Sequence, residues 1–546
     1  MENMRTSEKK ATSDMVFLRK STGLVREMSP SGALIYNVLT MGVASLVYVY
    51  ITAAYAYPGG SVPWAFFITG VLASITMLAY AMLASSLPRS GGDYVYQTRA
   101  KVPGFWSFGS VFAGLVLWEI GGTAIAGWFV ANVGLAPLFT LLGVQTGNTA
   151  LSNLGVWCTQ PLGESIITIV VIALTLWIMI RGLRVYQRLQ TWLALSLAVS
   201  IVLMVIILLT TSHVQFVSNL NGFMSKFGSN NFYGSLLQSV QKTGYNVLPT
   251  LTLLGTLGIA PAIWTQFSVA MWSVQQGGEI KSASHLNRQI YMIIGAIVIL
   301  TVVGIVLGGL IDQVFGRGFV NALAYAEDTG YPVLTYVPFF NVLIAAMSHN
   351  VIIEFLIPLG FLANAIQFVF SGGLAGSRIV LAMSFDGLLP PKLGEVSEKY
   401  HTPVFALSIF YALSAMVALL YLWIARLQTY FLSLGLATSV AVLTTMAAAV
   451  VFPYTAKSIF EGSPASRYKL FGIPVISIAG VIGFLWTAYM MYLWLTVPAL
   501  GIANLGSEIV IGGSFVVCII YYVIWVSMRR RQGINISQTF TEIPPE

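Results

Sequence analysis

The chain has 546 residues, of which 57% are hydrophobic and only 8% are charged, and its mean hydropathy is +0.82. An ordinary soluble domain is about a quarter charged, so this chain has too few polar groups to cover a water-soluble globule, and lipid is its expected solvent. We interpret the net charge of +8 as attraction to anionic lipid rather than to nucleic acid, because no aromatic residues that could stack on bases are interleaved with the basic ones.

The first thirty residues form an expected cytosolic tail. They carry Lys9, Lys10, Arg19, Lys20 and Arg26 among short apolar runs. No small-residue cleavage site follows an apolar core, so the pattern is not that of a signal peptide.

Twelve apolar stretches follow, each long enough for a membrane-spanning helix of about twenty residues. We predict spans near 31–57, 63–87, 105–133, 164–182, 187–211, 250–278, 288–312, 350–383, 403–425, 428–453, 471–496 and 508–528. This pattern predicts an all-α membrane protein with a transmembrane domain at 31–528, cytosolic tails at 1–30 and 529–546, and no soluble catalytic domain.

The distribution of basic residues predicts the orientation of these spans. With the amino terminus inside the cell, the expected inner segments hold 23 of the 27 Lys and Arg residues. Only Lys226, Lys242, Arg317 and Arg426 are left outside. Short cytoplasmic loops collect Lys and Arg, so we expect a multi-pass protein of the cell membrane with both termini in the cytosol.

Three expected outer segments, near 134–163, 212–249 and 313–349, are long and rich in Gly, Asn, Thr and Pro. Such segments are long enough to form lids over an outer vestibule, which Glu354 is also expected to face. Cys158 in an outer segment and Cys518 in the last span predict neither a disulfide framework nor a metal site. The chain has no nucleotide-binding glycine loop, and we expect no cofactor or metal.

Several short motifs follow the pattern of a known family. The most specific is 87–96, LPRSGGDYVY, which closes the second span. Residues 377–390 and 402–403 follow the eighth span, 278–281 close the sixth, and 37–45 in the first span match most loosely. On these motifs the chain resembles the amino acid–polyamine–organocation superfamily of secondary transporters.

The resemblance implies a LeuT-type fold. Two inverted five-helix repeats would cover about 31–211 and 250–453, and two further helices would cover 471–528. The first helix of each repeat would be broken in the middle of the membrane to form the substrate site. The substrate-binding residues implied are Met41, Gly42, Val43, Ala44, Ser45, Gln266, Phe267, Ser268, Val269 and Ala270. The chain departs from the usual pattern in having one glycine in the first of these runs and none in the second.

Broken helices have the chemistry to bind a zwitterion. Amino-terminal N–H groups of a half-helix suit a carboxylate, and exposed carbonyl groups suit an ammonium. Gly42 leaves room for such a solute, although small residues also allow plain helix packing. The resemblance further implies that an aromatic residue gates the site at the sixth-span break, with Phe267 and Trp264 as candidates. Core packing is the alternative for both.

Glu119 is the candidate coupling residue. An ionised carboxylate deep in a span costs about 3 kcal/mol, and Glu119 shares a helix face with Gly122, Thr123, Ala126 and Gly127. We interpret it either as a proton-titrating group or counter-charge, or as a protonated carboxyl that hydrogen-bonds between helices or is wetted from outside.

A polar stripe marks the eighth span. Asn364, Gln367 and Ser371 are spaced i, i+3 and i+7 on one helix face. The stripe either lines the solute pathway, with an ion site near Ser371, or makes hydrogen bonds between helices.

These features predict a secondary active permease for amino acids or related organic cations that works by alternating access. Some members of the resembled family use a lysine in the fifth span, where this chain has only Arg188, so proton-coupled symport through Glu119 is preferred. Amino-acid or polyamine exchange is the main alternative, and sodium coupling through Ser371 follows. A solute sensor and an intramembrane enzyme are the rivals from other classes. An enzyme is disfavoured because Glu119 has no other ionisable side chain beside it within the spans. The molecules expected to interact with the protein are an amino acid or amine as substrate, a proton and the lipid bilayer.

Overall fold

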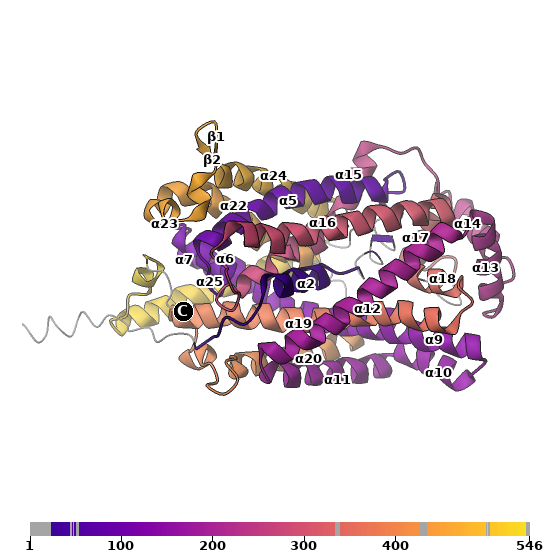
Figure 1. Cartoon of the computed structure of the whole chain (residues 1–546), viewed down its shortest axis with the longest axis horizontal. Coiled ribbons are helices and arrows are strands. Elements are labelled where there is room, and N and C mark those ends of the chain that lie inside the picture. The colour runs from indigo at the N-terminus through magenta and orange to yellow at the C-terminus, as the bar shows by residue number, and fades with distance from the viewer. Residues whose placement is uncertain are drawn as a thin grey trace, which may run out of the picture.

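The computed structural model describes residues 23–43, 46, 49–50, 54–333, 339–424, 434–497, 500 and 503–541. Long helices run side by side along the longest axis of the molecule (Figure 1). They are α5 (Val62–Ser86), α11 (Pro161–Ile180), α12 (Leu183–Thr210), α16 (Leu286–Ile311), α19 (Val351–Phe385), α20 (Val404–Trp423), α22 (Leu434–Thr455), α24 (Val475–Thr496) and α25 (Leu505–Arg531). A short antiparallel hairpin, β1 (Lys469–Leu470) with β2 (Ile473–Pro474), precedes α24.

Within the described residues, ten helical stretches are long and apolar enough to cross a membrane. They coincide with ten of the predicted spans, so an all-α, multi-pass membrane protein is confirmed. The predicted ninth span corresponds to α20, whose apolar part is a shorter helix over Val404–Leu420. The predicted first span is an interrupted helix, and the full count of twelve stays a prediction.

The first span begins as α2 (Pro30–Met41). Its start is specified locally, because Pro30 occupies the first turn and the Ser29 hydroxyl accepts a hydrogen bond from the Gly32 N–H at 3.0 Å. The helix ends before Gly42, and a short helical turn, α4 (Ala54–Ala56), follows further along the chain.

The sixth span differs from the first. α15 (Leu253–Phe267) passes directly into a 3₁₀ helix, η4 (Ser268–Gln275). The chain therefore changes helix type at Ser268 and remains helical. A 3₁₀ stretch longer than four residues is uncommon and often marks a hinge or local strain.

The third span extends beyond its expected end at residue 133. It is a continuous helical stretch, Gly104–Thr146, built from α7 (Gly104–Phe112), η2 (Ala113–Leu117), α8 (Trp118–Phe129), η3 (Val130–Leu135) and α9 (Ala136–Thr146). η2 and η3 are π-helical segments. The expected end of the third span at residue 133 was therefore too early, because the apolar run continues to Gly147, whose positive φ of 66° then ends the helix.

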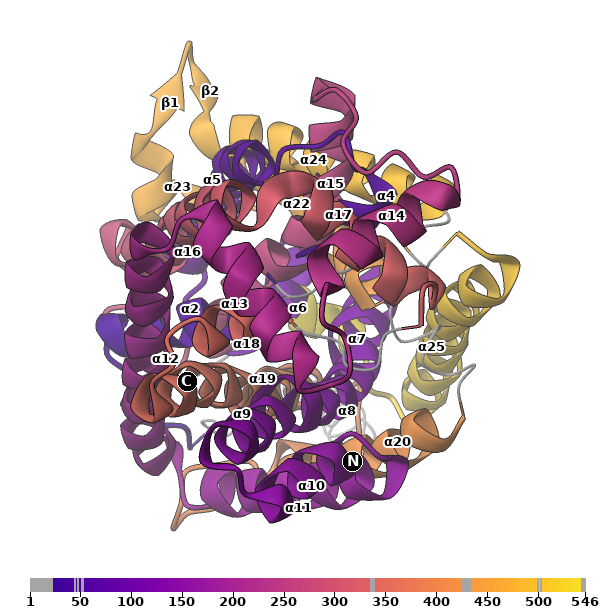
Figure 2. The ribbon, with the colours of Figure 1, turned by 90° about the vertical axis from the view of Figure 1, so that its right-hand side faces the viewer.

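The outer segments expected to be lids are mostly helical in the described residues. They form α10 (Thr149–Cys158), α13 (His213–Ser225), α14 (Phe232–Lys242), α17 (Arg317–Thr329) and α18 (Phe340–Ala346). The polar residues that suggested loops serve instead as helix caps, such as Asn148 before α10 and the Ser212–Gln215 capping box of α13. These helices gather at one end of the molecule (Figures 1 and 2).

The opposite end gathers the segments expected to be cytosolic. Met28 pairs with Ile280 after the sixth span through a β-bridge, and Glu27 forms a 2.8 Å ion pair with Arg184 in the first turn of α12, the fifth span. The basic loops thus share one end, as the charge pattern predicts. Their location in the cytosol stays a prediction.

Candidate functional site

The break in the first span occurs at Gly42. Its φ of 66° and ψ of 163° lie in a region that is essentially restricted to glycine. A Cβ atom at this position would lie 2.6 Å from Asn364 Oδ1 and 2.9 Å from Phe368 Cζ. Glycine is therefore required both by the backbone conformation and by the close approach of α19.

Asn364 holds the broken helix end. Its Oδ1 accepts a hydrogen bond from the Val43 N–H at 3.0 Å, and its Nδ2 donates to the Leu39 carbonyl at 2.8 Å. An interrupted helix in an apolar environment needs partners for its freed backbone groups. One side chain from α19 supplies both a donor and an acceptor.

The other members of the eighth-span stripe extend this network. Ser371 Oγ lies 2.7 Å from Thr40 Oγ1, and Gln367 Nε2 donates to Ser371 Oγ at 3.1 Å and to Tyr186 OH at 2.6 Å. In this conformation the stripe makes hydrogen bonds between helices. Gln367 Oε1, however, is buried and lacks a hydrogen-bond partner among the described residues. An unmet acceptor therefore lies within the network beside the helix break.

The first span and the end of the sixth are bound to each other. Asn37 Nδ2 donates to Ser273 Oγ at 2.9 Å, and the Ser273 N–H donates to Asn37 Oδ1 at 3.2 Å. The predicted sixth-span run 266–270 lies where α15 becomes η4. Met41, Gly42 and Val43 lie at the end of α2, and Ala44 and Ser45 fall outside the described residues.

The two candidate gating aromatics are both buried but face different neighbours. Phe267 packs edge-on against Phe66 of α5, with ring centroids 6.1 Å apart. Trp264 Nε1 donates to Ser439 Oγ at 3.2 Å, and its ring contacts Trp486 edge-on at 6.3 Å. Trp264 therefore contacts α22 and α24, whereas Phe267 contacts the second span.

Glu119 lies in α8 between the two π-helical segments η2 and η3, and such π-bulges are frequent at functional sites. Glu119 is only 6% exposed, and none of the ion pairs in the described part of the chain involves it. One turn later, Thr123 Oγ1 is buried without a hydrogen-bond partner there. A Cβ at Gly372 would lie 3.5 Å from the Glu119 carbonyl oxygen, so α8 packs against α19 next to Ser371.

A second polar network lies at the end with the basic loops and is centred on Asp93 in α6 (Gly92–Arg99). The buried Asp93 carboxylate accepts hydrogen bonds from Tyr80 OH at 2.6 Å, Thr445 Oγ1 at 2.6 Å and Gln275 Nε2 at 2.5 Å. Burial raises the pKa of Asp93, and these hydrogen bonds oppose that shift. The network therefore joins α6 to the second, sixth and tenth spans.

Two buried ion pairs complete this end. Arg99 Nη1 lies 2.8 Å from Asp386 Oδ2, and Tyr94 OH donates to the same oxygen at 2.7 Å. Arg378 forms a bidentate ion pair with Glu279, in which Nε donates to Oε2 at 2.8 Å and Nη2 donates to Oε1 at 2.8 Å. Glu279, Arg378 and Asp386 lie in the family motifs 278–281 and 377–390, and the sequence pattern assigned no role to them or to Arg99. Their charge within otherwise apolar flanks is the signal that could have singled them out.

An α-helical bundle with many membrane-length helices, a first helix broken at a glycine and polar networks at the break and at one end defines a multi-pass membrane protein. The chain matches the amino acid permease family over residues 33–535, and it belongs to that family. No curated protein matches the chain. Members of this family are transporters and not enzymes, so the resemblance and the non-enzymatic function expected from the sequence are both confirmed.

Proposed function

We propose that this membrane amino acid permease is a secondary active transporter that carries α-amino acids or related amines by alternating access. The observation that carries the proposal is the break at Gly42, where backbone groups are held in place by Asn364. Such a break is favourable only where it faces protein, water or a bound solute. Secondary transporters commonly place their substrate site at helix breaks of this kind.

The proposed substrate site combines backbone from two elements. Met41 to Ser45 supply it from the first span, and Gln266 to Ala270 supply it at the junction of α15 and η4. Backbone N–H groups would bind the substrate carboxylate, and carbonyl groups would bind its ammonium. Gln367 Oε1, the unmet acceptor in the adjacent network, is a further candidate partner for an ammonium. Phe267, at the junction, is the stronger of the two gating candidates, because Trp264 is hydrogen-bonded to α22.

Alternating access requires each end of the molecule to open in turn. The Glu279–Arg378 pair joins the segment after the sixth span to the end of the eighth span, and the Arg99–Asp386 pair joins the segments after the second and eighth spans. We propose that these pairs close the cytosolic end in the conformation described, and that they separate when that end opens.

The proposal is tested by flux in proteoliposomes that contain the purified protein. We expect uptake and counterflow of one or more of the twenty radiolabelled L-amino acids, or of amines derived from them, above empty liposomes. Counterflow needs no ion gradient, so it detects both symport and exchange. Saturable binding without flux for every compound would contradict the proposal and favour a solute sensor.

Coupling is proposed to use Glu119. Removal of water from a carboxyl favours its neutral form, and α8 packs beside Ser371, so protonation can be linked to rearrangement at the break. We expect an inward pH gradient to drive accumulation by the native protein and not by Glu119→Gln, which mimics the protonated state and should retain counterflow. Glu461→Gln, at an exposed residue, is the matched control. Equal accumulation by the native protein and Glu119→Gln would exclude Glu119 as the coupling residue. It would leave exchange, or sodium bound near Thr40 and Ser371, as the alternatives.

A further inference from the structure

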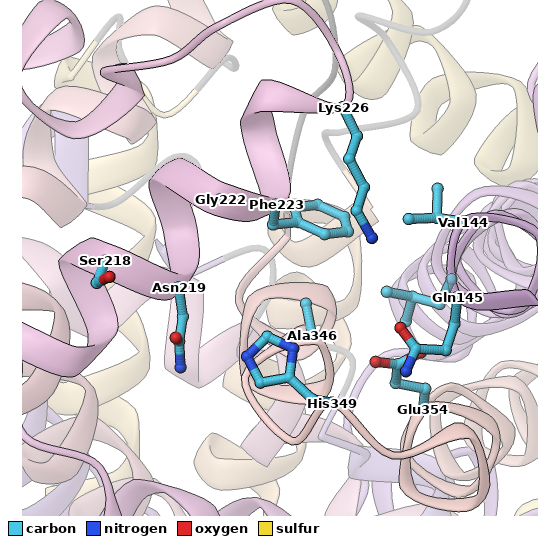
Figure 3. Close-up of a pocket in the computed structure, with 11 residues that line it drawn as sticks. Val144, Gln145, Ser218, Asn219, Gly222, Phe223, Lys226, Ala346, His349 and Glu354 are labelled. Atoms are coloured by element: carbon cyan, nitrogen blue, oxygen red, sulfur yellow. The ribbon is translucent and has the colours of Figure 1, made fainter. Parts of the chain in front are cut away.

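A small cavity lies at the end of the molecule opposite the basic loops (Figure 3). Its volume is about 230 Å³, and residues of α9, α13, α19 and the segment after α18 line it. Drug-sized ligands occupy pockets of about 300–1,000 Å³, so this cavity suits a smaller solute. It is separate from the network around Gly42 and contains none of the residues predicted from the sequence to bind substrate.

Two opposite charges face this cavity. Lys226, directly after α13, extends its ammonium into it, and Glu354, in the first turn of α19, presents its carboxylate from another side (Figure 3). Lys226 is exposed, whereas Glu354 is only 3% exposed. The two attract each other electrostatically, yet they are absent from the ion pairs within 4.0 Å in the described residues.

This arrangement leaves a buried carboxylate without a cation in contact. Burial disfavours the ionised form of an unpaired carboxyl group, so a positive group that enters the cavity would stabilise the carboxylate form of Glu354. The Lys226 ammonium, on the other side of the cavity, can bind a negative group on the same ligand. Gln145 and His349 lie beside the space between them, and Asn219 lines the cavity farther along α13 (Figure 3).

We propose that this cavity is an outer docking site for a zwitterionic α-amino acid, with its carboxylate on Lys226 and its ammonium on Glu354. A monovalent amine or acid would satisfy only one of the two charges and should bind more weakly. The biological role of this docking site, in which an amino acid binds at this cavity before it reaches the central site, rests on the proposed function. The two sites share α19, on which Glu354 precedes Asn364 by ten residues, or about 15 Å of helix.

Kinetics of uptake from the outer face of intact cells test the role of the two charges. With L-alanine and L-leucine as probes, or whichever L-amino acid the native protein carries, Lys226→Met and Glu354→Gln should each raise KM about tenfold, which corresponds to the loss of one paired charge. The maximal rate should change less than about twofold, because the central site is intact. Lys242→Met and Asp328→Asn, which neutralise exposed outer charges, are the matched controls and should leave KM unchanged.

Binding to purified protein separates the two sites. We expect two molecules of amino acid to bind per native chain and one to Gly42→Val, in which the central site is blocked. The molecule that remains should be lost when Lys226→Met is added. The exchanged pair Lys226→Glu with Glu354→Lys should restore binding, since a zwitterion can bind in the reversed orientation, and ethylamine and propanoate should compete poorly with L-alanine.

The outcomes distinguish this inference from the proposed function. If uptake occurs and Lys226→Met and Glu354→Gln leave KM unchanged, the docking site is refuted while the transporter function stands. Binding that depends on Lys226 and Glu354 in a protein without flux supports the docking site and overturns the transporter function. Tighter binding of ethylamine or propanoate than of L-alanine would also refute a zwitterion site.

Discussion

Replacing Gly42 by alanine should weaken transport and amino-acid binding at the central site by about five- to 150-fold, and replacement by valine should abolish transport and binding at that site. A non-glycine residue in this backbone region costs about 1–3 kcal/mol, and each 1.4 kcal/mol is tenfold in affinity. The added Cβ also collides with Asn364 and Phe368, so the polar network that holds the break must shift. Binding affinity and counterflow, measured on protein that elutes as a single species in detergent, test this expectation.

Gly512→Ala is the matched control. Gly512 lies on α25, and a Cβ there meets no atom within 4 Å, so this variant should match the native protein in binding and flux. Native affinity in Gly42→Ala and Gly42→Val would contradict a substrate site at the break. Loss of folding in Gly42→Val alone would leave Gly42→Ala as the decisive variant.

Replacing Arg378 by methionine should destabilise the protein by about 3–5 kcal/mol, because Glu279 would remain as a buried carboxylate without its partner. Both side chains are at most 2% exposed. The double variant Arg378→Met with Glu279→Met should recover most of this stability, since apolar residues of similar volume often replace a buried pair without loss. The midpoint of thermal unfolding in detergent measures both effects.

The exposed pair Lys457–Glu461 provides the control. Its N–O distance is 3.7 Å, and its side chains are 73% and 63% exposed, so Lys457→Met should cost less than about 1 kcal/mol. We further expect the double variant to retain amino-acid binding and to alter transport rate, because in the proposed alternating-access mechanism the pair joins segments that separate when this end of the molecule opens. An unfolding midpoint of Arg378→Met equal to that of the native protein would refute the buried ion pair.

Composition and the lengths of the apolar stretches were enough to predict a lipid environment and most of the helices. Lipid cannot satisfy exposed backbone groups, so apolar stretches of membrane length must be helical, and ten of the predicted spans are present as long apolar helices. The family resemblance implied a break in the first span at 41–45, and α2 ends at Met41, directly before Gly42. Composition was less reliable at the outer end, where caps such as Asn148 and Ser212 resemble loop residues but start helices.

The contacts between polar groups could not be predicted, because they join residues that are far apart in the chain. Asn364, whose Oδ1 accepts a hydrogen bond from the Val43 N–H, is 321 residues from Val43 in the chain. Arg378 is 99 residues from its ion-pair partner Glu279. Periodicity assigned the eighth-span stripe to one helix face without indicating its partners. Lys226 and Glu354 carry no local pattern that links them, and packing of α13 against its neighbours brings both to one cavity. Helix formation depends on neighbours within a few residues, and short sequence patterns reveal it. The contacts between these polar groups depend instead on how whole helices pack, which short sequence patterns do not show.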